Sequence, residues 1–264
     1  MYYQNIKKFQ KMGMGDSDMQ FIVRQKYLDE LIELYGTPDI KVITGIRRSG
    51  KSVLLQEFIT YLQSLEEKSN IVMINLQELE FDHLLEYHAL HKYILGQYKE
   101  GMNNVLLIDE VQMCPQFELA INSIYTKGIY DIYITGSNAY MLSGDLATLL
   151  TGRYVEISML PLSFKEYVEI TGILKEQAFS EYMKTGGFPY IAVMDRTDEK
   201  VEIYLEGIYN TVIVRDIEDR QSRKEMNCGK RKITDITLLK TIARYLASVI
   251  GSPISIKSIT NYLI

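Results

Sequence analysis

Gly45-Ile46-Arg47-Arg48-Ser49-Gly50-Lys51-Ser52 completes the pattern G-x-x-x-x-G-K-S directly after the β-branched run at 41–44. A strand, a glycine-bounded loop and a helix, in this order, let a chain hold the phosphates of a nucleoside triphosphate. The glycines permit backbone angles that turn N–H groups inward, and Lys51 adds a positive charge for the phosphate oxygens. The Ser52 hydroxyl suits a Mg²⁺ ligand, and Val53 opens a helix whose positive dipole end faces the phosphates. The sequence therefore predicts that residues 45–53 bind ATP or a related nucleotide together with Mg²⁺.

A second candidate element is the apolar run at 105–108, which ends in Asp109 and Glu110. Such a run is typical of a strand buried on both faces of a parallel sheet, and ligands collect at the carboxyl ends of these strands. We expect Asp109 to hold Mg²⁺ through water, and Glu110 to orient and deprotonate the attacking water. The alternative, a solvated acidic turn, is disfavoured by the phosphate-binding pattern upstream.

Polar residues beside two further strand-like runs are candidates for the same site. Ser137 and Asn138 follow the run at 132–135 and are suited to contact the γ-phosphate or the nucleophilic water, but they would cap the next helix equally well. Arg153 precedes the run at 154–157 and is a candidate for the cation that stabilises the transferred phosphoryl group, in its own chain or in a neighbouring subunit. A solvated surface arginine is the competing interpretation.

The alternation of strand-like and helical patterns predicts the fold class. Together with the run at 71–75, the strand-like runs number five, and each is followed by a helical pattern. This order predicts an α/β fold with a parallel sheet covered on both faces, over residues 21–160, after a poorly ordered segment 1–20. An amphipathic helix at 27–35 precedes the first strand. Ile22, Val23 and Arg24, just upstream, are candidates for contact with the nucleotide base.

Beyond residue 160 the strand patterns fade and helical patterns take over. We expect an all-helical lid subdomain at 161–226, followed by a linker and further helices at 227–264. The chain stops inside an apolar helical pattern at Ile264, so we expect it to be a fragment of a longer protein.

Composition and charge limit the function classes. With 47% apolar and 24% charged residues, the chain resembles ordinary globular proteins, and we expect neither a membrane span nor a signal peptide. Two distant cysteines, Cys114 and Cys228, predict a reduced, cytoplasmic protein without a disulfide framework. The net charge is −5, yet residues 220–264 hold nine basic and two acidic side chains. A basic C-terminal segment on an acidic body favours DNA contact, although a solvated linker explains it equally well.

The motifs in combination resemble those of a known family. They are ITGIRRSGKS (43–52), LIDEVQ (107–112), ITGS (134–137), LTGR (150–153), LPLSFKEY (160–167) and GGFP (186–189). From about residue 21 to its end, the chain resembles bacterial and archaeal AAA-type ATPases that have a winged-helix module and a C-terminal nuclease-like domain.

The resemblance implies a five-stranded P-loop NTPase core of the AAA type with the phosphate-loop strand central, a helical lid and the start of a winged helix. It implies that Glu110 is the water-activating base and that Ser137 or Thr135 senses the γ-phosphate, and it strengthens Arg153 as an arginine finger. The winged helix is incomplete in this sequence and the nuclease-like domain has no counterpart, so we expect no cleavage of nucleic acid by this chain.

Two function classes remain open at this point. The first is a Mg²⁺-dependent ATPase that couples hydrolysis to movement of the lid and C-terminal module, with DNA and a second copy of the chain as candidate partners. The second is a slow nucleotide-gated switch that binds a partner while ATP is held. Glu110 favours turnover, because a pure binding module needs no base.

Overall fold

The computed structural model describes residues 22–136, 150, 152–195, 197–211 and 236–263. It contains a five-stranded sheet with every pairing parallel, in the order β2-β3-β4-β1-β5. The strands are β1 (Ile40–Thr44), β2 (Ser69–Asn75), β3 (Asn103–Asp109), β4 (Asp131–Gly136) and β5 (Tyr154–Ser158). Each predicted strand-like run lies inside an observed strand, which confirms the predicted α/β fold class.

The strand order determines which loops meet. β4 lies between β1 and β3, with Ile134 in register with Val42 on one side and with Ile108 on the other. The phosphate-loop strand β1 is therefore internal, but the middle position belongs to β4, which differs from the central placement implied by the resemblance. Because all strands run in one direction, the segments that follow β1, β3 and β4 leave from the same edge of the sheet.

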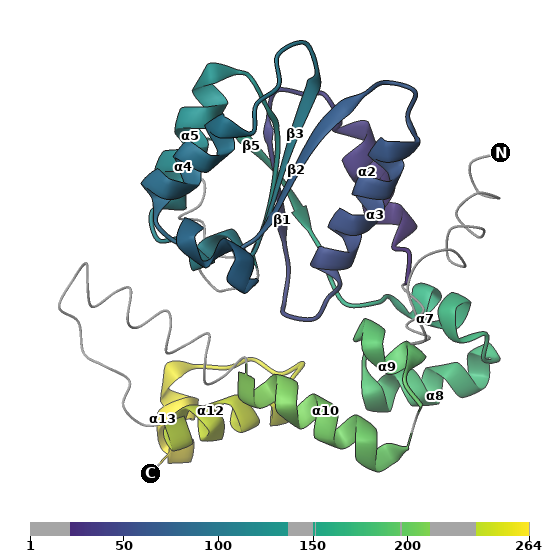
Figure 1. Cartoon of the computed structure of the whole chain (residues 1–264). Helices are drawn as coiled ribbons and strands as arrows, with labels where there is room; N and C mark the ends of the chain where they lie inside the picture. The colour runs from purple at the N-terminus through teal and green to yellow at the C-terminus, as the bar shows by residue number, and fades with distance from the viewer. Residues whose placement is uncertain (1–21, 137–149, 151, 196, 212–235, 264) are drawn as a thin grey trace. The chain divides into compact units, whose positions relative to one another are not determined.

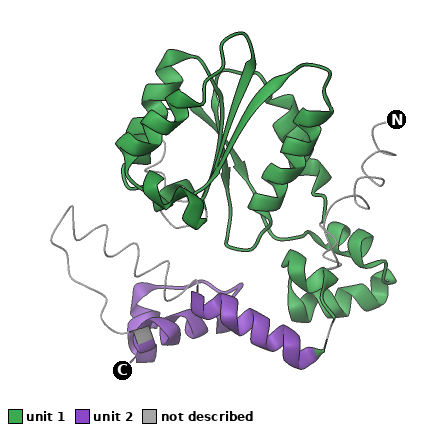
Figure 2. Cartoon of the chain, in the orientation of Figure 1, with its two compact units in different colours: residues 1–197 green, residues 198–264 purple. Residues whose placement is uncertain are grey.

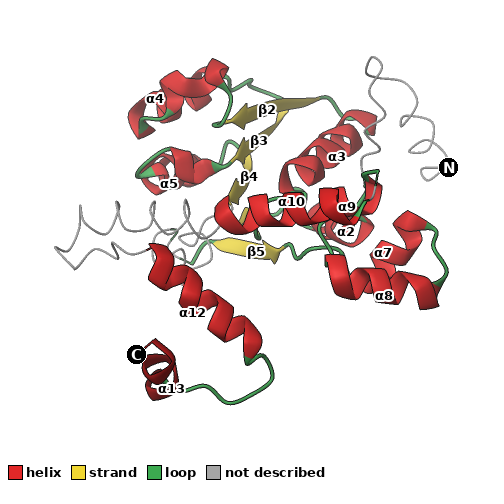
Figure 3. Cartoon of the chain, turned by 90° about the horizontal axis from the view of Figure 1, so that it is seen from below, coloured by secondary structure: helices red, strands yellow, loops and turns green. Residues whose placement is uncertain are grey.

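Helices cover both faces of the sheet (Figures 1 and 3), α4 and α5 on one face and α2 and α3 on the other. Their bounds are α2 (Gln25–Glu33), α3 (Lys51–Ser64), α4 (Tyr87–Gly96) and α5 (Phe117–Lys127), with short 3-10 helices η1 (Leu79–Leu84) and η2 (Val111–Met113) between them. Neighbouring strand residues point to opposite faces. Ile108 accordingly joins the apolar core under α4 and α5, while Leu107 joins the core under α2 and α3. Two separate cores thus explain why the central strands are apolar throughout.

Every regular element that the structure describes after β5 is a helix. The helices are α7 (Phe164–Thr171), α8 (Lys175–Thr185), α9 (Pro189–Val193), α10 (Asp198–Asn210), α12 (Ile236–Ser248) and α13 (Ile256–Leu263). Helices α7 to α9 share a small apolar cluster that includes Leu162 and Tyr167. No helix within the described ranges is long and apolar enough to cross a membrane.

The chain divides into two compact units, residues 1–197 and residues 198–264 (Figure 2). The second unit contains α10, α12 and α13, and the Nζ of Lys240 donates a hydrogen bond to Oδ1 of Asn210 at 2.8 Å within it. The helices of the predicted lid, 161–226, are therefore shared between the units. The action of this segment as a lid and the start of a winged helix at 227–264 stay predictions.

We predict that Gly187→Ala lowers the free energy of unfolding by about 2 kcal/mol or more. A Cβ at position 187 would overlap the carbonyl oxygen of Leu162, whose N–H donates to the Gly187 carbonyl at 2.6 Å. The matched control is Gly96→Ala at the end of α4, where an added Cβ meets no atom within 4 Å. The control is expected to be neutral or slightly stabilising. Urea unfolding measures both, and equal midpoints for the two variants would contradict this account.

Candidate functional site

The loop between β1 and α3 has the backbone shape of a phosphate cradle. Gly45 and Gly50 have positive φ angles, 151° and 101°, which glycine adopts without strain. A Cβ on Gly45 would also overlap the carbonyl oxygen of Met159, so the loop passes directly beside the end of β5. The ammonium group of Lys51 donates to the carbonyls of Gly45 and Ile46 at 3.0 and 3.1 Å and is almost completely buried. A cationic group thus lies across the loop at the start of α3.

The other predicted nucleotide-binding residues occupy this loop and the first turn of α3. Arg48 has a left-handed φ of 64°, and Ser49 is fully buried, with its N–H donating to the Ile46 carbonyl at 3.3 Å. Arg47, half-buried, precedes Arg48 in the turn. Ser52 lies exposed in the first helical turn, followed by Val53. The N-terminus of α3 therefore opens toward the loop, as an anion-binding helix end requires.

The two predicted metal ligands line one cavity. This cavity, of about 420 Å³, lies between α3 and the carboxyl ends of β2 and β3. Its lining includes Ser52 and Asp109 together with Val53, Gln56, Met73, Asn75, Glu78, Glu80 and Phe81. Within the described ranges no group of three or more His, Cys, Asp and Glu side chains could hold a metal by itself. A serine hydroxyl and one carboxylate fit Mg²⁺, which takes hard oxygen ligands and is completed by phosphates and water.

Thr135, at the end of β4, holds the two acidic residues. Its hydroxyl donates to the Asp109 carboxylate and accepts a hydrogen bond from the Glu110 N–H at 3.1 Å. Thr135 is completely buried, and its hydroxyl supports the acidic pair from inside the fold. Its predicted contact with the γ-phosphate stays a prediction, and Ser137 lies outside the described residues.

Gln112 is a site residue that the sequence analysis missed. Its side-chain amide donates to the Glu110 carboxylate, and the residue is only 3% exposed. Glu110 itself has a left-handed φ of 54°, which turns the chain sharply after β3. The signal in the sequence was a polar side chain two residues after the candidate base, within the motif LIDEVQ. A single sequence does not reveal that the two side chains point toward each other.

Arg153 lies at the opposite edge of the sheet from the phosphate loop. It precedes β5, and its carbonyl accepts a hydrogen bond from the N–H of Ile40 at the start of β1. Its guanidinium carbon is 5.4 Å from the centre of the Tyr125 ring, in a groove that also contains Asp131. A five-residue strand is roughly 17 Å long, so the nucleotide loop of the same chain is out of reach. Only the predicted action of Arg153 in a neighbouring subunit stays open.

Arg24 does not face open space where a base would bind. Its side chain is 4% exposed, and its guanidinium donates to Glu166 and to backbone carbonyls. Nearby on α3, both carboxylate oxygens of Glu57 are buried and lack a hydrogen-bond partner among the described residues. Burial raises the pKa of Glu57 to about 7. The nearby backbone N–H and the charge of Arg24 lower this pKa by a smaller amount, although the N–H makes no well-formed hydrogen bond to the carboxylate.

The AAA domain family matches residues 37–168. The chain belongs to this family. The match includes the phosphate loop, the acidic strand and the Glu166 helix start, which are the parts described above. The AAA domain classification agrees with the all-parallel sheet and with the loop that follows its first strand.

Two relatives of this AAA domain are described as uncharacterized proteins. An uncharacterized protein of Haemophilus influenzae is 36% identical over 249 residues, and one of Methanocaldococcus jannaschii is 30% identical over 264. These matches cover 92% and 93% of this chain but only 59% and 55% of the relatives. The solved Walker-type ATPase of Pyrococcus abyssi is similar in fold, with a TM-score of 0.56 at 15% identity over 96% of this chain and 91% of that one.

We predict that Thr135→Val destabilises the chain by about 1–3 kcal/mol. Valine keeps the shape of threonine but leaves the buried Glu110 N–H without its acceptor. The control is Thr126→Val on α5, whose exposed hydroxyl donates only to the Asn122 carbonyl. We expect it to change stability by less than about 0.5 kcal/mol. Urea unfolding compares the two, and a loss of similar size in both would contradict the bridging role.

We predict that Glu57→Gln removes part of the pH dependence of stability. The pKa of Glu57 is raised from 4.5 to about 7 in the folded chain, so folding favours the protonated form. The free energy of unfolding therefore falls by up to about 3 kcal/mol as the pH rises from about 4.5 to about 7, and it is constant above that pH. Glutamine should abolish this loss, measured by urea unfolding at pH 5 and pH 8. Glu33→Gln, on the exposed face of α2, corrects for the lost charge, and an unchanged pH dependence in Glu57→Gln would refute the assignment.

Proposed function

We propose that this AAA domain binds ATP with Mg²⁺ and hydrolyses its terminal phosphoanhydride bond. The supporting observation is that the phosphate loop, the Ser52–Asp109 cavity and Glu110 meet at one edge of the sheet. Loop, metal ligands and base are the parts that phosphoryl transfer to water requires. Because the chain spans less than three fifths of its curated relatives, the activity of a longer protein is also a proposal.

Each group at this edge has a role in the proposed reaction. The loop N–H groups and Lys51 bind and orient the phosphates. Ser52 and Asp109 would hold Mg²⁺, which neutralises charge on the phosphate oxygens when bound. Glu110 accepts a proton from the attacking water. Thr135 orients the Asp109 carboxylate and holds the backbone of Glu110 through its two hydrogen bonds.

The alternative is a slow, nucleotide-gated switch, and one observation favours it. The Gln112 amide donates to the same Glu110 carboxylate that would accept the proton of the water. In the proposed reaction, a carboxylate held by an amide donor would have to be released before it accepts a proton from water. Turnover would then wait on release of Glu110, while nucleotide binding would not.

We predict that Glu110→Gln retains ATP binding and lowers steady-state phosphate release at least about 100-fold, because only the base is lost. Lys51→Ala should weaken ATP binding about tenfold or more, because it removes the charge across the loop. Calorimetry measures binding, and Glu33→Gln and Lys127→Ala, both exposed, are the matched controls. Bound ATP without measurable release in either wild type or Glu110→Gln would favour the switch. No binding by the wild-type chain would overturn the proposal.

Several partners remain proposals. Arg153 is a candidate cation for the nucleotide of a second copy of the chain, which would require a homo-oligomer. The basic clusters at 220–232 that suggested DNA contact lie outside the described residues. The cytoplasmic location, which was predicted from the two distant cysteines, also stays a prediction.

A further inference from the structure

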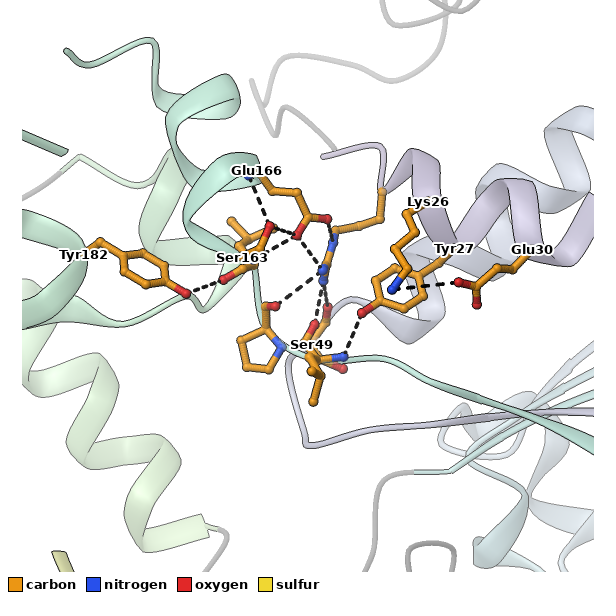
Figure 4. Close-up of polar contacts among 11 residues, drawn as sticks. Lys26, Tyr27, Glu30, Ser49, Ser163, Glu166 and Tyr182 are labelled. Atoms are coloured by element: carbon orange, nitrogen blue, oxygen red, sulfur yellow. Dashed lines mark hydrogen bonds and ion pairs between the residues drawn. The ribbon is translucent and has the colours of Figure 1, made fainter. Parts of the chain in front are cut away.

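The Arg24 side chain, just before α2, joins three segments that are distant in the sequence. Figure 4 shows Ser49, Ser163 and Glu166 close together in this cluster. Its Nε and Nη2 donate to the two carboxylate oxygens of Glu166 at 2.7 and 3.0 Å. Its Nη1 donates to the Leu160 carbonyl at 2.7 Å and to the Ser49 carbonyl at 3.5 Å, and Nη2 donates to the Pro161 carbonyl at 3.4 Å. The fork geometry of a buried guanidinium makes this arrangement directional as well as attractive.

The segment that leaves β5 is held against the phosphate loop. The Met159 N–H donates to the last carbonyl of β1 at 2.8 Å, and the Met159 carbonyl lies where a Cβ of Gly45 would be. One residue later, the Leu160 N–H donates to the Tyr27 hydroxyl at 3.2 Å, while its carbonyl accepts from Arg24. A shift of the loop therefore acts on the same short segment that leads into α7.

Glu166 attaches this cluster to the helices α7 to α9. It accepts from the Ser163 N–H at 2.8 Å, and the Ser163 hydroxyl accepts from the Glu166 N–H at 3.3 Å, which forms a capping box at the start of α7. Burial alone would raise the pKa of Glu166, but hydrogen bonds from Arg24 and Ser163 lower it below its ordinary value. Glu166 is therefore ionised and binds the guanidinium as a charged pair.

The Ser49 carbonyl links the guanidinium to nucleotide binding. It belongs to the peptide group whose N–H is that of Gly50, inside the phosphate loop. Because a trans peptide is planar, its C=O and N–H point in opposite directions. A phosphate that orients the Gly50 N–H toward itself therefore fixes the Ser49 carbonyl on the far side of the loop, where Arg24 lies. Binding of a phosphate in the loop should therefore strengthen the contact between Arg24 and the Ser49 carbonyl, which is the longest of the cluster.

Glu57, on α3, is a second buried carboxylate that the charge of Arg24 influences, although no hydrogen bond joins it to the guanidinium. Its oxygens are buried and have no hydrogen-bond partner among the described residues, and the charge of Arg24 acts on it. If α7 and Glu166 moved away, the Arg24 charge would be left buried and uncompensated, which is strongly unfavourable. The buried Arg24 charge therefore ties the start of α7 to the phosphate loop through Glu166.

We propose that Arg24 is a positioning residue that couples nucleotide occupancy of the phosphate loop to the attachment of helices α7 to α9. Glu166 is its partner when these helices are attached. The inference rests on the proposed nucleotide binding. It predicts that a bound nucleotide tightens the start of α7, although no residue of α7 to α9 is required to touch the nucleotide.

The test is amide hydrogen exchange of residues 164–193 in the full chain, with and without Mg²⁺ and a non-hydrolysable ATP analogue. In wild type we expect the analogue to slow this exchange about threefold or more. Glu166→Gln should exchange about tenfold faster without nucleotide and lose the slowing, although the analogue still binds by calorimetry. Glu57→Gln, the matched control at the second carboxylate, should keep the slowing. Arg24→Lys, which retains charge but not the fork, should behave as Glu166→Gln and serves if that variant fails to fold.

The outcomes separate the two proposals. Wild-type chain that binds the analogue without slower exchange at 164–193 would overturn the coupling and leave nucleotide binding intact. The coupling is equally refuted if Glu166→Gln keeps the slowing or if Glu57→Gln loses it to the same extent. Wild-type chain that does not bind the analogue at all would overturn the proposed function itself, and the coupling with it.

Discussion

The close passage of the phosphate loop beside the end of β5 is the constraint on which the rest of the site depends. Gly45 has no side chain, so the Met159 carbonyl lies against its backbone, and the Met159 N–H extends the pairing of β1 with β5. This contact leads β5 directly into the segment that Arg24 and Tyr27 hold. The phosphate loop is therefore supported by the buried strand β5 and by the segment that leads into α7. A loop built this way is preorganised for an anion before one arrives.

At the acidic edge, the same structure supports two kinetic behaviours. Thr135 holds Asp109 and Glu110 through one hydroxyl, which places both acids without using charged partners. Gln112 then occupies the Glu110 carboxylate. If Glu110 is the base, as proposed, its release from this amide would precede turnover. The proposed ATPase and the proposed switch would then differ in how often one hydrogen bond breaks.

The candidate site residues that directly follow a strand could be predicted from the sequence. The loop at 45–53 and the pair Asp109 and Glu110 were found because glycine spacing and apolar runs are local signals. The bridging role of Thr135 was not predicted, because it depends on β4 lying between β1 and β3, and strand order is not encoded in local spacing. Arg153 was a candidate for the site because its motif precedes a strand. A residue that precedes a parallel strand lies at the amino ends of the strands, however, which is the opposite edge of the sheet from the phosphate loop.

The sequence by itself determined which segments form strands and helices, since continuous apolar runs and helical apolar patterns report local burial directly. It also predicted a phosphate-binding loop after the first strand. Only the tertiary structure decided that the Gln112 amide meets the Glu110 carboxylate and that Arg24 pairs with Glu166, 142 residues away. The physical reason is that a polar side chain has no periodic signature: its partner is selected by where folded segments cross, and a buried charge is tolerated only at the crossing that satisfies it.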